Sequence, residues 1–188
     1  MYTDPTNKQN TFCHCPIRRI NMPKIIENIS GQLLAEARKQ IAERGYSATT
    51  VRSIASACGI AVGTVYNYFP SKEMLVASFV AEDWSHATDS IKKELSGDVK
   101  DTIRAVYDLL SGFCTDHAAL FTDPEAIKVF PTFLPERHGQ LRDQIAEMLF
   151  PVCNERFTAQ FIAEALLTWT VAGTPFDELY SVIERLIK

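Results

Sequence analysis

Apolar residues recur along almost the whole chain of 188 residues at intervals of three and four, the spacing that lines one face of an α-helix. Alternating β-branched runs of strand length are not found. The pattern therefore predicts an all-α fold of about nine helices. They are expected at about residues 23–45, 50–58, 62–69, 71–95 and 100–121, in a short stretch starting at 122, and at 137–152, 155–173 and 176–187.

The boundaries of these helices follow from capping residues and helix breakers. Pro23 suits the opening turn of the first helix, and Gly45 is expected to end it. Thr50 is the expected N-cap of the second helix. The prolines of "FPTFLPERHG" (130–139) predict an irregular stretch, and Pro151 is expected to separate two helices, because proline cannot sit in a helix interior.

Residues 50–69 predict a helix-turn-helix motif, because two helices of about eight residues are joined at Gly59. On a helical wheel, the second of these helices places Val62, Val65 and Phe69 within about 60° of one another, which predicts its buried face. The opposite face is small and polar, is edged by tyrosines and carries no carboxylate.

This exposed face has the chemistry of a DNA reader. Gly63 would let the helix approach closely, Asn67 can pair with the major-groove edge of adenine, and Thr64 can meet a thymine methyl or a phosphate. Phenols, a lysine and the start of the second helix would hold phosphates. A packing element with half-buried tyrosines is the alternative. The candidate DNA-binding residues are Thr50, Arg52, Gly63, Thr64, Tyr66, Asn67, Tyr68 and Lys72.

The charge is unevenly divided along the chain. Residues 1–72 hold nine Lys/Arg against four Asp/Glu, and residues 73–188 hold ten against nineteen, within a net charge of −4. A basic first third on an acidic remainder suggests a polyanion-binding unit on a body that avoids polyanions. Chance clustering of solvated charges is the alternative, so charge alone does not decide.

At "ARKQIAERGYSATTVRSIASACGIAVGTVYNYFPSKEML" (37–75), the chain resembles the N-terminal domain of the TetR family of bacterial transcriptional regulators, and the resemblance covers about residues 25–80. Ala61 stands where the family often has a capping serine and Ser53 where an acid is common, departures expected to weaken caps. Residues 1–21 are polar and without periodicity, which predicts a flexible arm. The resemblance implies a helix-turn-helix domain at 22–70 and a ligand-binding and dimerisation domain at 71–188. It also implies that DNA is touched by Thr50, Gly63, Thr64, Tyr66, Tyr68 and Lys72, with Asn67 at a variable base-reading position.

The last two predicted helices suggest a homodimer. The helix at 155–173 is apolar nearly all round, so it must be buried on two sides, and the helix at 176–187 carries an apolar stripe. Two such helices per subunit can form a four-helix bundle across a two-fold axis, although the centre of a monomer's core is the alternative. The dimer would require a near-palindromic operator with half-sites about 34–36 Å apart. The predicted interface residues are Phe161, Ala165, Leu166, Trp169, Leu179, Val182, Ile183 and Leu186.

The helices between residues 71 and 133 hold enough aromatic residues to line an apolar pocket for a small-molecule effector. Filling of an ordinary core is the alternative, and the effector cannot be identified from the residues. No cofactor is expected. The candidate pocket residues are Trp84, Tyr107, Phe113, His117, Phe121 and Phe130.

Other classes of function receive less support. The chain has no glycine-rich phosphate loop, no G-x-S-x-G and no H-E-x-x-H, so an enzyme is not expected. Cys13-His14-Cys15 lacks a second ligand pair, so no metal site is expected. No apolar run is long enough to cross a bilayer, so the sequence predicts a cytoplasmic protein. Repression is preferred over activation, because a dimer bound to its operator can occlude polymerase. A helical protein-interaction module without DNA binding is the alternative.

Overall fold

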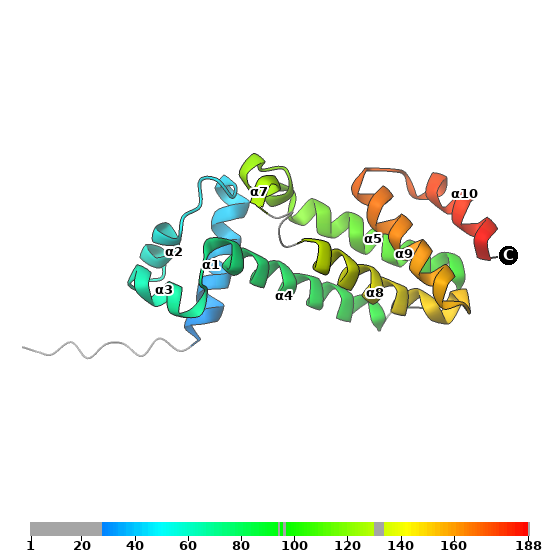
Figure 1. The fold of residues 1–188 in the computed structure, drawn as a ribbon, viewed down its shortest axis with the longest axis horizontal. Helices are drawn as coiled ribbons and strands as arrows, with labels where there is room; N and C mark the ends of the chain where they lie inside the picture. The colour runs from blue at the N-terminus through cyan, green and yellow to red at the C-terminus, as the bar shows by residue number, and fades with distance from the viewer. Residues whose placement is uncertain (1–27, 94, 96, 130–133, 188) are drawn as a thin grey trace, which may run out of the picture.

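The computed structural model describes residues 28–187 apart from 94, 96 and 130–133. Within these residues the chain is all-α, as predicted, with ten helices where about nine were expected. Figure 1 shows an elongated molecule with α1–α3 at one end, α9 and α10 toward the other, and α4 running between. The helices are α1 (Ile29–Arg44), α2 (Val51–Ala57), α3 (Val62–Tyr68), α4 (Lys72–Lys92), α5 (Val99–Asp116), α6 (Ala118–Phe121), α7 (Pro124–Val129), α8 (Leu134–Cys153), α9 (Arg156–Val171) and α10 (Phe176–Ile187).

The additional helix arises because the helix predicted to run to about residue 121 is broken at His117. This residue leaves helical geometry, with φ −105° and ψ 16°. Its carbonyl accepts the N–H groups of Leu120 at 2.9 Å and Phe121 at 3.0 Å, which starts the new turn of α6. The break changes the direction of the chain, so α6 can pack in a different core from α5.

Two proline expectations were wrong. The stretch expected to be irregular at 130–139 is helical from Leu134, so Pro135 occupies the first turn of α8, where a missing N–H costs no helical hydrogen bond. The first part of that stretch, 130–133, lies outside the described residues. Pro151 lies inside the last turn of α8 instead of separating two helices. At the other end of the chain, the side chain of Asn28 caps α1, while Pro23 lies outside the described residues.

The first apolar core joins α1–α3 to segments that lie far along the chain. Leu33 and Ile54 are fully buried in it. Phe79, from the first half of α4, belongs to the same core, as do Leu120 of α6 and Ala126 of α7. The division between domains at residue 70 stays a prediction, but the apolar core around α1–α3 continues beyond that residue.

The second core holds the other end of the molecule together. The helix α5 contacts α4, α8, α9 and α10, and α8 packs along α9. Ile103, Ile145 and Leu166 are fully buried at this meeting point. Trp84, from the second half of α4, is also part of this core, so both cores share α4.

None of the helices in the described part of the chain is long and apolar enough to span a membrane. The predicted arm at 1–21 lies outside the described residues.

The shared first core makes a prediction for α6. Replacing Leu120 by Ala removes a side chain that is 2% exposed, and we expect unfolding to become easier by about 2–5 kcal/mol. The matched control is Ile127→Ala on α7, whose side chain is 53% exposed and should cost no more than about 0.5 kcal/mol. Urea denaturation followed by circular dichroism measures both. Equal losses would show that α6 is not a structural part of this core.

Candidate nucleic-acid interface

The start of α2 is built around a reciprocal cap. Thr50 has extended backbone geometry, and its hydroxyl oxygen accepts the N–H of Ser53 at 3.0 Å. The Ser53 hydroxyl oxygen in turn accepts the N–H of Thr50 at 3.1 Å. Both orphan donors of the helix start are thereby satisfied. The expectation that Ser53 weakens this cap was wrong, because its hydroxyl takes the role of the usual carboxylate.

A polar cluster braces this cap from α1. Gln40 is 5% exposed, and its side-chain oxygen accepts the Ser53 hydroxyl at 2.7 Å. Its amide group donates to Glu36 at 2.6 Å, and Arg44 donates to both Gln40 and Ser53. The end of α2 that carries Thr50 is therefore held against α1, and the Thr50 side chain stays exposed.

The turn between α2 and α3 needs a glycine. Gly59 has φ +67°, a left-handed conformation that costs glycine little. The following helix begins after Ala61, whose side chain makes no capping hydrogen bond, as expected from its departure from the family pattern. The open amide groups at the start of α3 are left for solvent or for a ligand.

The structure turns α3 as the helical wheel predicts. Val65 and Phe69 are buried, at 1% and 8% exposed. Gly63 and Asn67 are exposed on the other side. Tyr66 is 50% exposed and stands on the solvent side of the helix.

Most of the other predicted contact residues also reach solvent. Tyr68 is 47% exposed, Arg52 is exposed and Thr64 is half-buried. Together with Thr50 at the start of α2, the exposed face of α3 forms a continuous candidate surface, which we call the reading face. It is defined by Thr50, Arg52, Gly63, Thr64, Tyr66, Asn67 and Tyr68.

Gly63 is not required by packing within the described chain. Outside its own helix, no heavy atom lies within 4 Å of the position that a Cβ would take. The residue also needs no left-handed backbone, since its φ is helical. Even in the first turn of a helix, glycine is a poorer helix former than alanine, so its use here fits close approach by something outside the molecule.

Lys72 is engaged within the molecule. Its ammonium donates to the carbonyl oxygen of Tyr46 at 2.6 Å and lies 3.6 Å from the centre of the Tyr46 ring. Burial lowers the pKa of the Lys72 ammonium, against the opposing effect of Glu125, Glu73 and Asp123. A phosphate contact by Lys72 stays a prediction, in which hydrogens of the ammonium not used by Tyr46 would be the donors.

The loop before α2 is anchored by Asp123. Its carboxylate accepts the N–H of Ser47 at 2.8 Å and the Ser47 hydroxyl at 2.6 Å. These bonds, with the hydroxyl bond first, lower the pKa of the Asp123 carboxyl to about 2, so it is ionised at neutral pH. The segment that carries α6 and α7 is thereby tied to the connection between α1 and α2.

Four of the candidate effector residues form one chain of ring contacts, in which Phe113 lies against Trp84 and His117, and His117 lies against Phe121. Phe113 and His117 line a cleft of about 290 Å³ between α1, α4, α5 and α6. Trp84 does not line it, because its indole N–H donates to Gln144 at 2.7 Å within the second core. Tyr107 donates to the carbonyl of Thr174 at 2.9 Å and is also outside the cleft.

The two remaining candidates add little to the cleft. Phe121 is 43% exposed, and its ring lies 6.0 Å from the ring of His117. It packs on the edge of the cleft without lining it. Phe130 lies outside the described residues.

The predicted dimer residues divide into two groups. Leu166, Leu179 and Ile183 are buried within the single chain, so their burial needs no second copy, and Ala165 is half-buried. The other four are large apolar side chains that a single chain leaves roughly half exposed. These are Phe161, Trp169, Val182 and Leu186, at 53%, 54%, 56% and 47% exposed.

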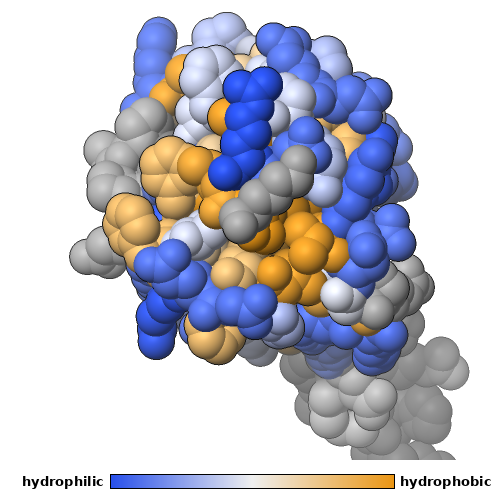
Figure 2. Space-filling model, turned by 90° about the vertical axis from the view of Figure 1, so that its right-hand side faces the viewer, coloured by the Kyte–Doolittle hydropathy of each residue, from blue (hydrophilic) through white to orange (hydrophobic). Residues whose placement is uncertain are grey.

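Further apolar side chains extend this exposed group. Phe157 and Val171, on α9, are 71% and 64% exposed. Figure 2 looks at the end of the molecule where α10 finishes and shows apolar residues gathered in the middle of this view, framed by hydrophilic ones. We call the apolar side chains that α9 and α10 expose the bundle face. A group of large apolar side chains left exposed on two neighbouring helices is typical of an interaction site.

In the described part of the chain, no three His, Cys, Asp or Glu side chains lie close enough to hold a metal ion. The Cys13-His14-Cys15 segment lies outside the described residues. The cysteines that the structure describes, Cys58, Cys114 and Cys153, are free thiols. Burial raises the pKa of the Cys153 thiol and so keeps it in the protonated form.

The sequence of the candidate interface is similar to that of known bacterial regulators. The profile of the family described as "Bacterial regulatory proteins, tetR family" matches residues 33–79, the stretch from α1 into α4. The HTH-type transcriptional repressor KstR2 from Rhodococcus jostii is 32% identical over 158 residues, which cover 84% of this chain and 64% of that repressor. The HTH-type transcriptional regulator UidR from Escherichia coli K12 is 27% identical over 77 residues, or 41% of this chain.

The likeness in structure extends beyond the matched domain. The TetR family repressor AlkX from a Dietzia strain superposes with a TM-score of 0.58 at 15% identity, over 86% of this chain and 94% of AlkX. This likeness concerns the fold. Among the curated relatives, the chain spans 39% of the length of UidR and 64% of that of the Rhodococcus repressor, so it matches only part of each.

The cap of α2 makes a stability prediction. We expect Thr50→Ala to lower the free energy of unfolding by about 0.5–2 kcal/mol, because Ser53 loses its N–H acceptor at the helix start. Thr50→Ser keeps a hydroxyl and serves as the matched control, with nearly the parent's stability. Thermal unfolding measures the difference. Equal melting temperatures for the two variants would mean that the cap contributes nothing to the fold.

Proposed function

We propose that the chain is a TetR-family regulator, a sequence-specific DNA-binding transcriptional regulator that acts as a dimeric, effector-responsive repressor, because the family profile matches residues 33–79 and the chain is 32% identical to a repressor over 158 residues. The observation that carries the proposal is the outward orientation of α3. Its exposed side chains are small, polar and phenolic, and they include no carboxylate. A surface of this kind fits the major groove of a duplex.

Each part of the reading face has a role in this proposal. Asn67 lies where it can offer a paired donor and acceptor to a base, and Gly63 allows the helix to come close to the groove. The phenols of Tyr66 and Tyr68 donate to phosphates on either side. Thr50 accepts the Ser53 N–H while its own hydroxyl hydrogen has no acceptor among the described residues, so it can donate to a further phosphate.

The bundle face supports a homodimer. Four large apolar side chains on α9 and α10 are about half exposed in the single chain, and burying them would stabilise an assembly. Two copies related by a two-fold axis would bring four helices together, and each copy would cover the bundle face of the other. The two α3 helices would then meet half-sites about 34–36 Å apart on a near-palindromic operator.

The regulatory part of the proposal concerns α4. This helix begins directly after the helix-turn-helix segment and enters the second core, so a small molecule bound in the body can alter how α3 is presented. Only a ligand that prefers one arrangement over the other changes the occupancy of DNA. Repression fits a dimer that blocks polymerase, and the bacterial cytoplasm is where such a regulator would meet DNA.

The reading face is tested with the DNA upstream of the chain's own gene, by fluorescence anisotropy across a series of salt concentrations. We expect Lys72→Met to weaken binding and to reduce the slope of log K against log salt by about 1, the value of one lost phosphate contact. Lys92→Met is the matched control, because Lys92 lies on the same helix at its far end. Its slope should equal that of the parent. Identical slopes for both variants would remove Lys72 from the interface.

Base recognition is tested separately with Asn67→Ala. We expect a loss of about 1–3 kcal/mol on the preferred operator and little change on unrelated DNA, because a base contact carries sequence preference. Tyr66→Phe, which removes only a hydroxyl, should weaken binding to both kinds of DNA to a similar extent. Parent-like operator preference and affinity in both variants would contradict the assignment of α3 as the reading helix.

The dimer is tested by placing charge on the bundle face. The double variant Trp169→Glu, Val182→Glu should weaken self-association about 30-fold or more, because removal of a central aromatic anchor alone costs about 2 kcal/mol. Analytical ultracentrifugation gives the dissociation constant. Ile127→Glu, which alters an equally exposed apolar side chain on α7, should associate like the parent. Association that is unchanged by the double variant would show that the dimer, if any, forms elsewhere.

A further inference from the structure

The cleft of about 290 Å³ lies where the two parts of the molecule meet. Helix α1 contributes Arg38, α4 contributes Phe79 and Asp83, and α5 and the break that follows contribute Phe113, Asp116 and His117. The floor is apolar, since Phe79 is 1% exposed, and the rim is charged. A cavity with an apolar floor and a few converging polar groups is the usual form of a small-molecule site.

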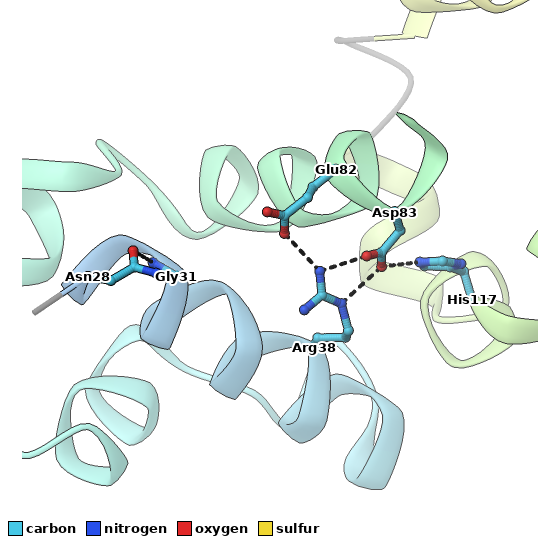
Figure 3. A network of polar contacts seen from close by, with 6 residues as sticks. All are labelled: Asn28, Gly31, Arg38, Glu82, Asp83 and His117. Carbon is cyan, nitrogen blue, oxygen red and sulfur yellow. Dashed lines mark hydrogen bonds and ion pairs between the residues drawn. The ribbon is translucent and has the colours of Figure 1, made fainter. Parts of the chain in front are cut away.

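The side chain of Arg38 provides one cation on the charged side of this cleft. The Arg38 guanidinium donates from Nε to Asp83 at 3.0 Å and from its Nη2 to the other Asp83 oxygen at 2.6 Å. It also donates to Glu82 at 3.1 Å, and its Cζ lies 5.4 Å from the centre of the Phe79 ring. Figure 3 shows Arg38 reaching across from α1 to the two carboxylates of α4. The wall of the cleft thus already places one planar guanidinium between carboxylates and an aromatic ring.

The same carboxylate continues the connection to the body. The Asp83 oxygen that accepts the Arg38 Nε–H lies 3.0 Å from Nε2 of His117, whose Nδ1 lies 3.0 Å from the carbonyl oxygen of Phe113. Burial raises the pKa of Asp83, but hydrogen bonds from Arg38 and His117 outweigh it and hold the pKa below its usual value. Both ring nitrogens of His117 therefore face acceptor oxygens, one on α4 and one on α5.

One carboxylate of the cleft is uncommitted. Asp116 is exposed beside His117, and within the described chain no hydrogen bond or ion pair occupies it. A ligand cation placed there would lie beside the Phe113 ring, which stacks 4.3 Å from the ring of His117. Two carboxylates line the cleft, Asp83 and Asp116, and Glu82 lies beside it on Arg38, so acidic groups outnumber the Arg38 guanidinium and the site favours a positive ligand over a negative one.

We propose that this cleft is a binding site for a small organic cation with an aromatic body, whose amidinium or guanidinium group takes the place of the Arg38 guanidinium on Asp83, with Asp116 as a second acceptor. The aromatic body lies on Phe79 and Phe113. The ligand competes with Arg38 and so separates α1 from α4 at this point.

The consequence for DNA rests on the proposed regulatory function. In the unliganded molecule, Arg38 holds α1, and with it the helix-turn-helix segment, to Asp83 on α4 and through Asp83 to His117 at the start of α6. Displacement of Arg38 releases this connection and alters how α3 is held relative to the body. A cation in the cleft therefore lowers affinity for the operator.

Benzamidine is the probe, because it joins a phenyl ring to a planar amidinium. Benzamide and benzoate are its neutral and anionic isosteres. Titration of the full chain, followed by NMR signals of the His117 ring and the Phe113 amide, should give saturable benzamidine binding with a dissociation constant on the order of 1 mM, as befits so small a ligand. Benzamide should bind at least about fivefold more weakly, and benzoate should not bind.

Variants test the competition directly. Arg38→Met removes the internal cation and should tighten benzamidine binding about threefold or more, since the carboxylates lose their partner. Arg104→Met is the matched control, because Arg104 makes an exposed ion pair with Asp177 elsewhere, and it should leave the affinity unchanged. Asp116→Asn should weaken binding several-fold, whereas Asp108→Asn, another exposed acid of α5, should not. Thermal unfolding confirms that each variant is folded.

Two results would overturn the proposal: equal binding of benzamidine and benzoate, or Arg38→Met binding benzamidine no more tightly than the parent. The binding experiment needs no DNA, so it stands or falls apart from the proposed function. In operator titrations, saturating benzamidine should weaken the parent's binding about as much as Arg38→Met does without ligand. If benzamidine binds tightly in the cleft but leaves the operator affinity unchanged, only the regulatory link is rejected. If the unliganded parent does not bind the operator, the proposed function is rejected instead.

Discussion

The sharing of α4 between two apolar cores is the constraint on which the rest of the structure depends. Its first half buries Leu75 and Phe79 among α1–α3, and its second half buries Trp84 among α5 and α8. A helix of 21 residues is about 32 Å long and behaves as one stiff element. Whatever moves the far half of α4 therefore moves the near half, and the reading face sits directly before that near half.

The local features of the reading face could be predicted from the sequence, and the distant contacts could not. The positions of Thr50 and Gly59 follow from backbone rules that act within a few residues, and the orientation of α3 follows from its period. The break at His117 and the docking of Leu120 on the first core depend on partners far along the chain. Arg38 was counted only among the bases that attract DNA, because its partner Asp83 lies 45 residues away and no local pattern connects them.

The acidic residues of the body also make contacts to the basic N-terminal part, which the net charges of the two parts do not reveal. Asp83 and Asp123, both from the acidic part of the sequence, hold the basic part through Arg38 and Ser47. The resulting contacts lie away from α3, which carries no acid of its own. Opposite charges thus stabilise the junction while the reading face stays free of repulsion toward phosphates. The same basic residues cannot all serve DNA, since Arg38 is committed to carboxylates, whereas Lys72 gives one hydrogen of its ammonium to Tyr46 and keeps the others for a phosphate.

The contribution of α6 and α7 to the first core has a consequence for how such a protein can be divided. A fragment cut after the helix-turn-helix segment would lack Phe79, Leu120 and Ala126, and would expose the apolar surfaces that they cover. The unit that can be transplanted onto another body is therefore discontinuous in sequence. A working chimera has to carry the first half of α4 together with the segment from His117 to Val129, and its seams belong inside α4, at the end of α5 and after α7 instead of at the end of α3.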